Sequence, residues 1–590
     1  MATINNLSTG FQSNALMTFG AAASTTKVTA TTDISGFDAT KIKAITAAEM
    51  AALTTEQISS ISTAAMAGLT AGQLKVLSNT NVAAFTEQQM GAFSKIQIAA
   101  FKPSQIGAMT SEQINALSTS QMGALSVTQI ASLNVSRIKD IDNTNLGALS
   151  AKQIQALTTD QIVNLIGEQL GSMSTTQVAS MKVNQVAALE TRDMVSMTTA
   201  QVAALTASQV KALKSEQLQS LSTTQLQAIE TTDLKSMTVA QVASFTTTQV
   251  QALTTAQLNA MTVAELNALG SSQLQALTTT QLSSLNATSI AKLKDTQVSA
   301  LSTEQVAALT TAQVKSLALK AVTALGSDQL NAMDATQVAA LTGAQIKALN
   351  VNTLASLGTT QVNALTSSQV AGLSVAAVAS LTTEQLNALS TTQVQSLTAN
   401  QIKGLSASKL ESLSTDQMAA LNVSQLKALS ASQLQGLSTD DVAALTTTQI
   451  QSLSAAQVKA LTTDAMASLT TSQVSALSAT QIKSLSANQI GALTSTNVAG
   501  LVTSQVSALS ASQIQAFSTS AVEALSTGVL NAMSAKQVAA LTTTQVQALS
   551  TSSIDDISTT NLKAFTTAQV AALTTAAVAQ LGTAQVAALT

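Results

Sequence analysis

The chain contains no cysteine, histidine, tryptophan or tyrosine, and it has a single proline among its 590 residues. Without cysteine there is no disulfide framework, and without histidine the side chain most often used for acid–base catalysis near neutral pH is missing. Charged residues make up 9% of the chain and the net charge is −3, so the clustered Lys and Arg that neutralise nucleic-acid phosphates are missing too. The composition argues against an enzyme and against a nucleic-acid binder.

Long hydrophobic runs are also missing. No stretch approaches the roughly 18 apolar residues that a membrane-spanning helix requires, so we expect no membrane span. A mildly apolar stretch, Ala15–Ala23, lies near the N-terminus, but no Lys or Arg precedes Lys27. The positively charged start of a secretory signal peptide is therefore absent, and export by a route that leaves the N-terminus intact stays open.

What the chain does contain is small aliphatic residues in a strict repeat. Apolar residues occupy 46% of positions although aromatic residues occupy only 2%, which is more apolar than a disordered chain. From Phe37 to Leu589 a large apolar residue recurs every eight positions without an insertion or deletion. We therefore divide the chain into a non-repeat N-terminal segment, residues 1–36, and a continuous octapeptide array, residues 37–590.

Each octad reads L-[ST]-x-x-Q-[VIL]-x-A, as in LTTEQLNA from Leu381. Ser or Thr followed three residues later by Gln is a capping box, in which each side chain accepts a hydrogen bond from the backbone N–H of the other residue. The apolar residues at positions 1 and 6 flank this box as a hydrophobic staple. The octad therefore predicts a helix from about position 3 to position 8, after which the next octad starts another helix.

The single proline supports this phase. Pro103 occupies position 3 of its octad, the first helical residue, where proline is favoured because no intrahelical bond is required of its missing N–H. A β-solenoid is the alternative, since Thr and Val are good strand formers. Strands require alternating apolar and polar residues with Gly, Asn or Asp at the corners, whereas positions 1, 6 and 8 do not alternate and most octads lack Gly. The pattern favours an all-α solenoid.

Helices this short must stack on one another, because isolated helices of fewer than about 12 residues are marginal in water. We expect a superhelix with positions 1 and 6 inside, small position-8 residues that allow close approach, and variable positions 4 and 7 facing water. Lys at position 7 recurs 24 residues apart, at Lys211 and Lys235 and again at Lys403 and Lys427. This interval indicates about three octads per coil.

The two ends suggest contacts with other subunits. Residues 1–36 are interpreted as a flexible tail or as an assembly or anchoring segment, in which Lys27–Thr32 forms an edge strand. The array stops in mid-octad at Thr590 without a polar capping repeat of the kind that closes a solenoid. We therefore expect a homo-oligomer or polymer joined by end-to-end or lateral contacts, or a longer parent array.

Residues that could carry chemistry are few. The closest carboxylate pairs are Asp440 with Asp441 and Asp555 with Asp556, and as neighbours on a short helix the two members of each pair are expected to point in different directions. The other acids are expected on variable surface positions. We interpret these groups as structural or solvating and assign no catalytic or cofactor-binding residue.

One further set of residues has the composition of a weak Ca²⁺ site. Asp140, Asp142 and Asn143 could bind the ion together with backbone carbonyls. We interpret them instead as helix caps in an atypical octad and assign no metal site. The Gln column at position 5 is likewise explained by capping rather than by ligand binding.

The tract Leu381–Ser396, LTTEQLNALSTTQVQS, resembles the repetitive tracts of large bacterial surface and secreted proteins, including adhesin stalks and surface-layer-like polypeptides. The resemblance covers residues 37–590 and rests on the style of the repeat and on composition. It implies a location outside the cell or at its surface, and secretion without a cleaved N-terminal signal.

These observations lead to a structural hypothesis for function. The chain is expected to be an extracellular protein that assembles with itself into a filament, sheath or surface layer, because it is long, weakly charged and chemically unreactive. One alternative is the spacer of an adhesin, with recognition located elsewhere or on one face of the solenoid. Another is an ice-binding surface, since Thr at positions 2 and 3 would form regular ranks.

Overall fold

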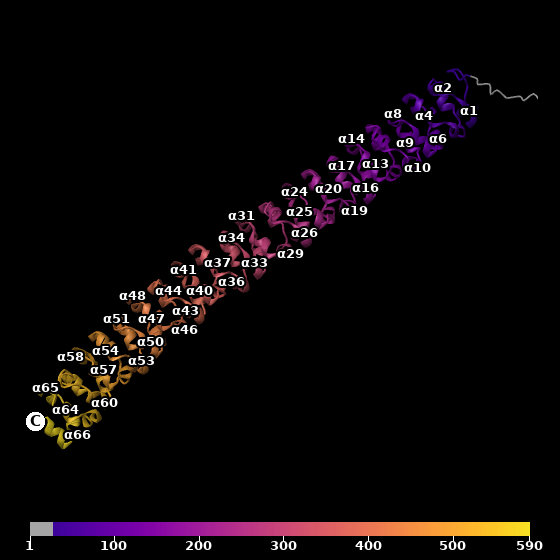
Figure 1. Ribbon diagram of the computed structural model, residues 1–590. Coiled ribbons are helices and arrows are strands. Elements are labelled where there is room, and N and C mark those ends of the chain that lie inside the picture. The colour runs from indigo at the N-terminus through magenta and orange to yellow at the C-terminus, as the bar shows by residue number, and fades with distance from the viewer. Residues whose placement is uncertain (1–26, 590) are drawn as a thin grey trace, which may run out of the picture. The chain divides into compact units, whose positions relative to one another are not determined.

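In the computed structural model the described residues are 27–589, and every regular element within that range is a helix. The range contains 67 α-helices of four to six residues and two 3₁₀-helices. The chain forms two compact units, one ending at Phe245 and the other beginning at Thr246, and both are built from the same helical repeat (Figure 1). The all-α solenoid is confirmed and the β-solenoid alternative is wrong. None of the described helices is long and apolar enough to cross a membrane.

Each α-helix begins at position 3 of its octad, as predicted, and ends between positions 6 and 8. Helices α13 (Ala151–Ala156) and α14 (Thr159–Val163) illustrate the pattern. Between them Leu157 and Thr158 are extended, with ψ angles of 135° and 161°, and these two residues turn the chain into the next helix. Pro103 is the first residue of its helix, as predicted.

Each short helix packs against the helix three octads further along the chain. In the first unit α15 (Gly167–Ser172) contacts α18 (Thr191–Ser196), which contacts α21 (Ser215–Ser220). Three octads thus complete one coil, which confirms the estimate from the Lys spacing. Helices at this interval form what we call a row, and each unit has three rows (Figure 1).

The core runs through the centre of the coils and consists of positions 1 and 6. Phe85, Phe93 and Phe101 are the position-1 residues of three consecutive octads. Their rings meet edge to face, with centroids 5.2 Å apart for Phe85 and Phe93, 5.4 Å for Phe93 and Phe101, and 6.5 Å for Phe85 and Phe101. Because all three rings approach one another, the position-1 side chains of one coil meet at its centre.

Position 8 lies against position 3 of the preceding coil, 29 residues earlier. The Ser236 hydroxyl donates to the Ala207 carbonyl at 2.8 Å. A Cβ atom placed on Gly500 would lie 2.3 Å from the Thr471 carbonyl oxygen. Small residues at position 8 therefore allow the coils to approach closely, as the sequence predicts.

Residues 27–36 differ from the predicted edge strand, because they form two turns. The side-chain amide of Gln57 donates to the carbonyls of Thr29 at 2.8 Å and Thr32 at 2.7 Å. One side chain binding two carbonyls three residues apart holds the segment in a turn, which an extended strand does not permit. Val28 and Ile34 are buried, so the segment covers part of the first coil. The rest of the predicted tail or anchor, residues 1–26, lies outside the described residues.

The close approach at position 8 predicts a contrast between two glycines of the second unit. Gly500→Ala should destabilise the protein by about 1–3 kcal/mol, because its Cβ atom would collide with the Thr471 carbonyl. Gly372 also occupies position 8 but has no atom within 4 Å of its Cβ position, so Gly372→Ala should be neutral or stabilising by up to about 1 kcal/mol. Urea unfolding followed by circular dichroism measures both. Equal effects of the two substitutions would contradict this packing.

Candidate functional surface

The side chain at position 5 joins each coil to the one before it. The Gln161 Oε1 accepts from the Thr158 backbone N–H at 2.8 Å. Its Nε2 donates to the carbonyls of Ile130 at 3.1 Å and Leu133 at 2.8 Å, which lie 31 and 28 residues earlier. Gln161 has no exposed surface. One buried amide therefore caps its own helix and fastens that helix to the preceding coil.

The second unit repeats this arrangement. The Gln313 Oε1 accepts from the Thr310 N–H at 2.8 Å, and its Nε2 donates to the carbonyls of Leu282 at 2.9 Å and Leu285 at 2.7 Å. The Gln bond to the capping residue also survives where that residue has no hydroxyl, since the Lys102 N–H still donates to the side-chain oxygen of its Gln at 2.6 Å. The amide is thus the constant part of the capping box.

Other hydrogen-bond donors at position 5 also bind carbonyls of the preceding coil. The Asn81 Nδ2 donates to the Leu53 carbonyl, 28 residues earlier, at 2.7 Å. The Arg137 guanidinium donates to the carbonyls of Ala108, at 3.2 Å, and Met109. Where position 5 carries Gln, Asn or Arg, it therefore supplies an N–H group to the preceding coil.

The octad pattern predicts the capping role of the Gln side chain but not its link to the preceding coil. The capping by the amide oxygen is confirmed, but the partner of the amide nitrogen lies in another coil, and a pattern within one octad does not contain it. A signal was present nonetheless. A Gln side chain carries two N–H donors that must be paired when the residue is buried, and capping occupies only its oxygen.

The paired carboxylates have separate surroundings. Asp440 is exposed, whereas Asp441 is buried at position 5 with its Oδ2 accepting from the Ser438 N–H at 3.0 Å and hydroxyl at 2.7 Å. Asp555 and Asp556 are both exposed. Asp441 therefore belongs to a capping box rather than to a pair of cooperating acids.

Three acids contradict the expectation that carboxylates lie at variable surface positions. Asp193, Glu265 and Asp441 all occupy position 5 and are at most 3% exposed. Each accepts a hydrogen bond from the N–H of its own capping residue, so the oxygen half of the Gln role is kept. The expectation failed because Asp and Glu can replace Gln as caps.

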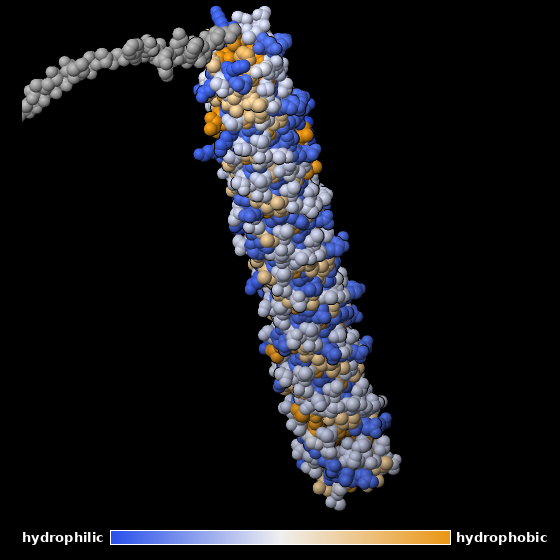
Figure 2. Space-filling view, turned by 90° about the vertical axis from the view of Figure 1, so that its right-hand side faces the viewer, coloured by the Kyte–Doolittle hydropathy of each residue, from blue (hydrophilic) through white to orange (hydrophobic). Residues whose placement is uncertain are grey.

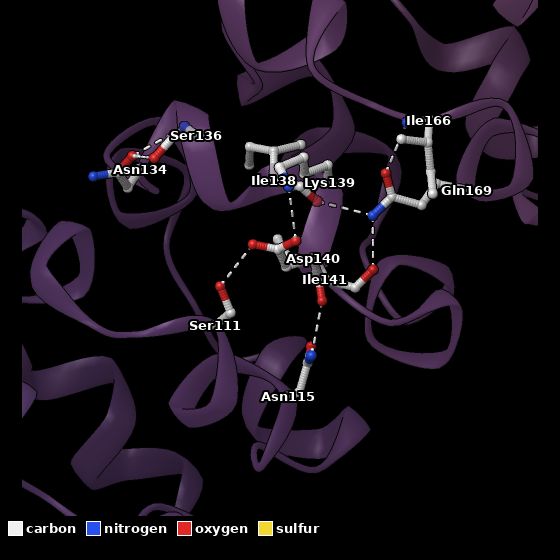
Figure 3. A network of polar contacts seen from close by, with 10 residues as sticks. All are labelled: Ser111, Asn115, Asn134, Ser136, Ile138, Lys139, Asp140, Ile141, Ile166 and Gln169. Atoms are coloured by element: carbon white, nitrogen blue, oxygen red, sulfur yellow. Dashed lines mark hydrogen bonds and ion pairs between the residues drawn. The ribbon is translucent and has the colours of Figure 1, made fainter.

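The residues suggested for Ca²⁺ bind other partners, and Figure 3 shows those of Asp140. Asp142 caps α12 (Asn143–Gly147), and its Oδ1 accepts from the Asn145 N–H at 2.7 Å. Asp140 ends the 3₁₀-helix η2 (Val135–Asp140), and its Oδ2 accepts from the Ser111 hydroxyl of the preceding coil at 3.0 Å. The cap interpretation is right for Asp142, whereas Asp140 links two coils. No group of three or more potential acidic ligands occurs within residues 27–589.

Within residues 399–484 of the second unit, exposed charges are sorted by row. Asp416, Asp440 and Asp464 are exposed on three stacked helices, α46 (Thr415–Ala419), α49 (Thr439–Ala444) and α52 (Thr463–Ala467). We call this set the acidic row. Like charges therefore recur once per coil along one side of the unit.

Lysines occupy the other two rows of the same stretch, and we call these the basic rows. Lys403 and Lys427 are exposed on the stacked helices α44 (Ala399–Lys403) and α47 (Val423–Ala428). Lys459 and Lys483 are exposed on α51 (Ala455–Ala460) and α54 (Ala479–Ser484). Glu411, at the end of α45 (Ala407–Glu411), is an acid on a basic row. None of the side chains of the acidic and basic rows forms an ion pair with another described residue.

Two hollows on the surface of the second unit are grooves between consecutive coils. One lies between residues 395–399 and 422–425 and is lined without a charged side chain. Another lies between residues 311–315 and 339–342, with Lys315 at its edge. On the face that Figure 2 displays, apolar side chains appear as small separate spots among polar ones. Neither groove gathers the groups that acid–base or nucleophilic chemistry requires.

Comparison with known proteins identifies the repeat. The family model of the ALTTAQ repeat matches at residues 98–135, 186–223, 226–263, 343–375, 423–455, 434–471, 471–503, 522–551 and 554–590. Together these matches cover half of the chain. No curated protein matches it. One solved structure, "Structure of APUM23-GGAAUUGACGG", aligns over 62% of this chain and 84% of that chain at 14% identity, but its TM-score of 0.15 carries no argument.

The role of the buried amide predicts a contrast between two glutamines. Gln161→Leu keeps an apolar chain of similar volume but leaves the Thr158 N–H and the Leu133 carbonyl without their partner, so it should destabilise the protein by about 2–4 kcal/mol. Gln155, exposed at position 7 of α13, is the matched control, and Gln155→Leu should change stability by less than about 0.5 kcal/mol. Urea unfolding compares them. A Gln161 variant as stable as its control would refute the linking role.

Proposed function

The chain belongs to the ALTTAQ repeat family, and we propose that it is an extracellular structural protein that assembles with copies of itself into a filament, sheath or surface layer. The observation that carries the proposal is the periodic sorting of charge over residues 399–484 of the second unit. The acidic row and the basic rows have the same spacing, because each advances by one coil per charge. Two copies lying side by side can therefore match several opposite charges at once.

Matching several charges is necessary because one surface ion pair contributes only about 0–1 kcal/mol. The charges of the three rows have no ion-pair partner among the described residues of their own chain. Charge complementarity between surfaces favours association and fixes its register. Lateral contact between an acidic row and a basic row uses charges that the single chain leaves unpaired. The proposed partner is the chain itself, because the acidic row and the basic rows of one chain supply both signs of charge at the same interval.

The proposed location rests on resemblance and composition. The repeat resembles tracts of large bacterial surface and secreted proteins, and the chain has no cysteine whose oxidation outside the cell would matter. The proposal includes no catalytic group, cofactor or metal. Protease treatment of intact producing cells tests the location, because an exposed array is degraded while cytoplasmic markers survive.

Charge matching predicts how assembly responds to mutation and salt. Purified chain should form regular assemblies in electron micrographs at low ionic strength. Fewer should form at about 1 M salt, where screening reduces the Debye length to about 3 Å. Replacing Asp416, Asp440 and Asp464 together by Lys should abolish lateral order, since the acidic row then repels the basic rows.

The control makes the same change in net charge without removing a row. Asp160, Glu216 and Glu384 are exposed acids that do not stack on one another, and their joint replacement by Lys should leave lateral order intact. Discrete monomers at high concentration and low salt would contradict self-assembly and favour the adhesin-spacer alternative. Equal loss of order in both variants would contradict the role of the acidic row.

A further inference from the structure

Asp193 is a carboxylate at a position that in most octads supplies an N–H donor. It lies at position 5 in α18 and has no exposed surface. Its Oδ2 accepts from the Glu190 backbone N–H at 2.9 Å. Its Oδ1 is buried and has no hydrogen-bond partner. Asp193 therefore performs the oxygen half of the Gln role and leaves the other half undone.

The repeat geometry places carbonyl groups opposite the unpaired oxygen. Counting back 31 and 28 residues from position 5 reaches Ile162 and Leu165 in the preceding coil. Asn at the same position binds carbonyls at these intervals, since Asn81 Nδ2 reaches a carbonyl 28 residues earlier at 2.7 Å and Asn561 Nδ2 reaches one 31 residues earlier at 2.7 Å. Asp has the shape of Asn, so its Oδ1 reaches the same place. An ionised oxygen there has no proton to donate to these carbonyls, and the one opposite charge near it is Arg192, whose Nε lies 3.6 Å away.

A protonated carboxyl resolves this conflict, because its O–H replaces the N–H of Asn. Glu49 shows the opposite case at the same octad position. Its Oε1 accepts from the Val28 backbone N–H at 3.0 Å and its Oε2 accepts from the Thr46 N–H at 3.0 Å. Hydrogen bonds from Thr46 and Val28 lower the pKa of Glu49, whereas burial raises the pKa of Asp193. The neighbouring coil thus decides which protonation state suits position 5.

The charged groups around Asp193 are few. On its own helix the Arg192 Nε lies 3.6 Å from the Asp193 Oδ1 but 3.1 Å from the exposed Glu190 Oε2, so the guanidinium is shared. The helices packed against α18 carry Glu168, on α15, and Glu216, on α21, with Lys214 capping α21. Arg192 opposes the rise in the pKa of Asp193 and Glu190 adds to it, but burial is the largest cause.

We propose that the side chain of Asp193 links two coils of the first unit by a hydrogen bond that forms only when the carboxyl is protonated. In the protonated state its Oδ1–H donates to a backbone carbonyl of the preceding coil, as the Gln and Asn side chains of other octads do. Ionisation releases that proton to solvent, removes the donor and sets a negative charge against the carbonyls. The joint between α15 and α18 is then weaker than its neighbours, and acid restores it.

The sign of the pH effect follows from the direction of the shift. An Asp whose pKa is raised by folding binds its proton more tightly in the folded state, so protons stabilise that state. The stabilisation is fully present below the ordinary Asp pKa of about 3.9 and is lost as the pH rises through the raised value. Most acid-sensitive folds respond in the other direction, because their carboxylates are stabilised as anions.

Hydrogen exchange of the full chain tests the proposal, with peptides from residues 157–172 and 189–196 as the readout. After correction for the intrinsic pH dependence of exchange, protection in these peptides should fall as the pH rises from about 4 to about 8. The fall should be about tenfold for each unit by which the pKa of Asp193 is raised. Asp193→Asn should remove this dependence and keep the protection high at both pH values. Asp160→Asn, at an exposed site of the same unit, should leave the dependence unchanged.

A second variant, Asn145→Asp, makes the opposite substitution at another coil. It keeps the proposal testable if Asp193→Asn does not fold. Asn145 occupies position 5 and its Nδ2 donates to the Ile114 carbonyl at 3.1 Å. Asn145→Asp should create the same pH-dependent loss of protection around residues 109–115 and 141–147. The proposal is overturned if Asp193→Asn keeps the wild-type pH dependence, or if Asn145→Asp exchanges equally at both pH values.

Discussion

The buried side-chain amide at position 5 is the interaction on which the rest of the structure depends. A helix of four to six residues is too short to persist in water, and its unpaired N–H and C=O groups need partners when they are buried. The amide oxygen pairs with the N–H that starts the helix, and the amide nitrogen pairs with a carbonyl at the bend of the preceding coil. Local and long-range order are therefore supplied by the same side chain. The apolar residues at positions 1 and 6 form the core of coils that this bond joins to one another.

Much of the fold could be predicted because the residues that start and end each helix lie within one octad. The capping box and the placement of Pro103 both refer to residues within eight positions, and both are confirmed. Features that depend on a second coil were harder to predict. The spacing of Lys211 and Lys235 predicts the coil period because the two lysines belong to octads whose helices are stacked in one row. The partner of the Gln161 nitrogen, 28 residues away, left no trace inside one octad.

The wrong expectations have the same cause. Lys27–Thr32 has the composition of a strand, but Gln57 from another octad bends it into turns. Acids at position 5, such as Asp193 and Glu49, were expected to be surface charges, because the sequence of one octad does not contain the groups that face them from the neighbouring coil. Glu49 accepts from the Val28 N–H, whereas the second oxygen of Asp193 has no hydrogen-bond partner. Within one octad Asp193 and Glu49 look alike, since each is an acid at position 5. Only the stacked structure shows that their surroundings differ.

An array of this kind has a consequence for function that a globular fold lacks. Since each coil contacts only its neighbours, stability is a sum over local joints, and a single weak joint such as that at Asp193 affects its surroundings without unfolding the rest. The surface likewise repeats once per coil, so charges placed on one row are presented at regular intervals to a second copy. Both the proposed assembly and the proposed proton-operated joint follow from the spacing that the amides impose.

The central claim is tested most directly by an experimental density map of the chain at a resolution that defines side chains. We expect a helix to begin at position 3 of each octad. We also expect each buried Gln to bridge the N–H of its own capping residue and the carbonyl 28 residues earlier. Position-5 side chains that point to solvent, or extended strands between residues 37 and 589, would contradict the account.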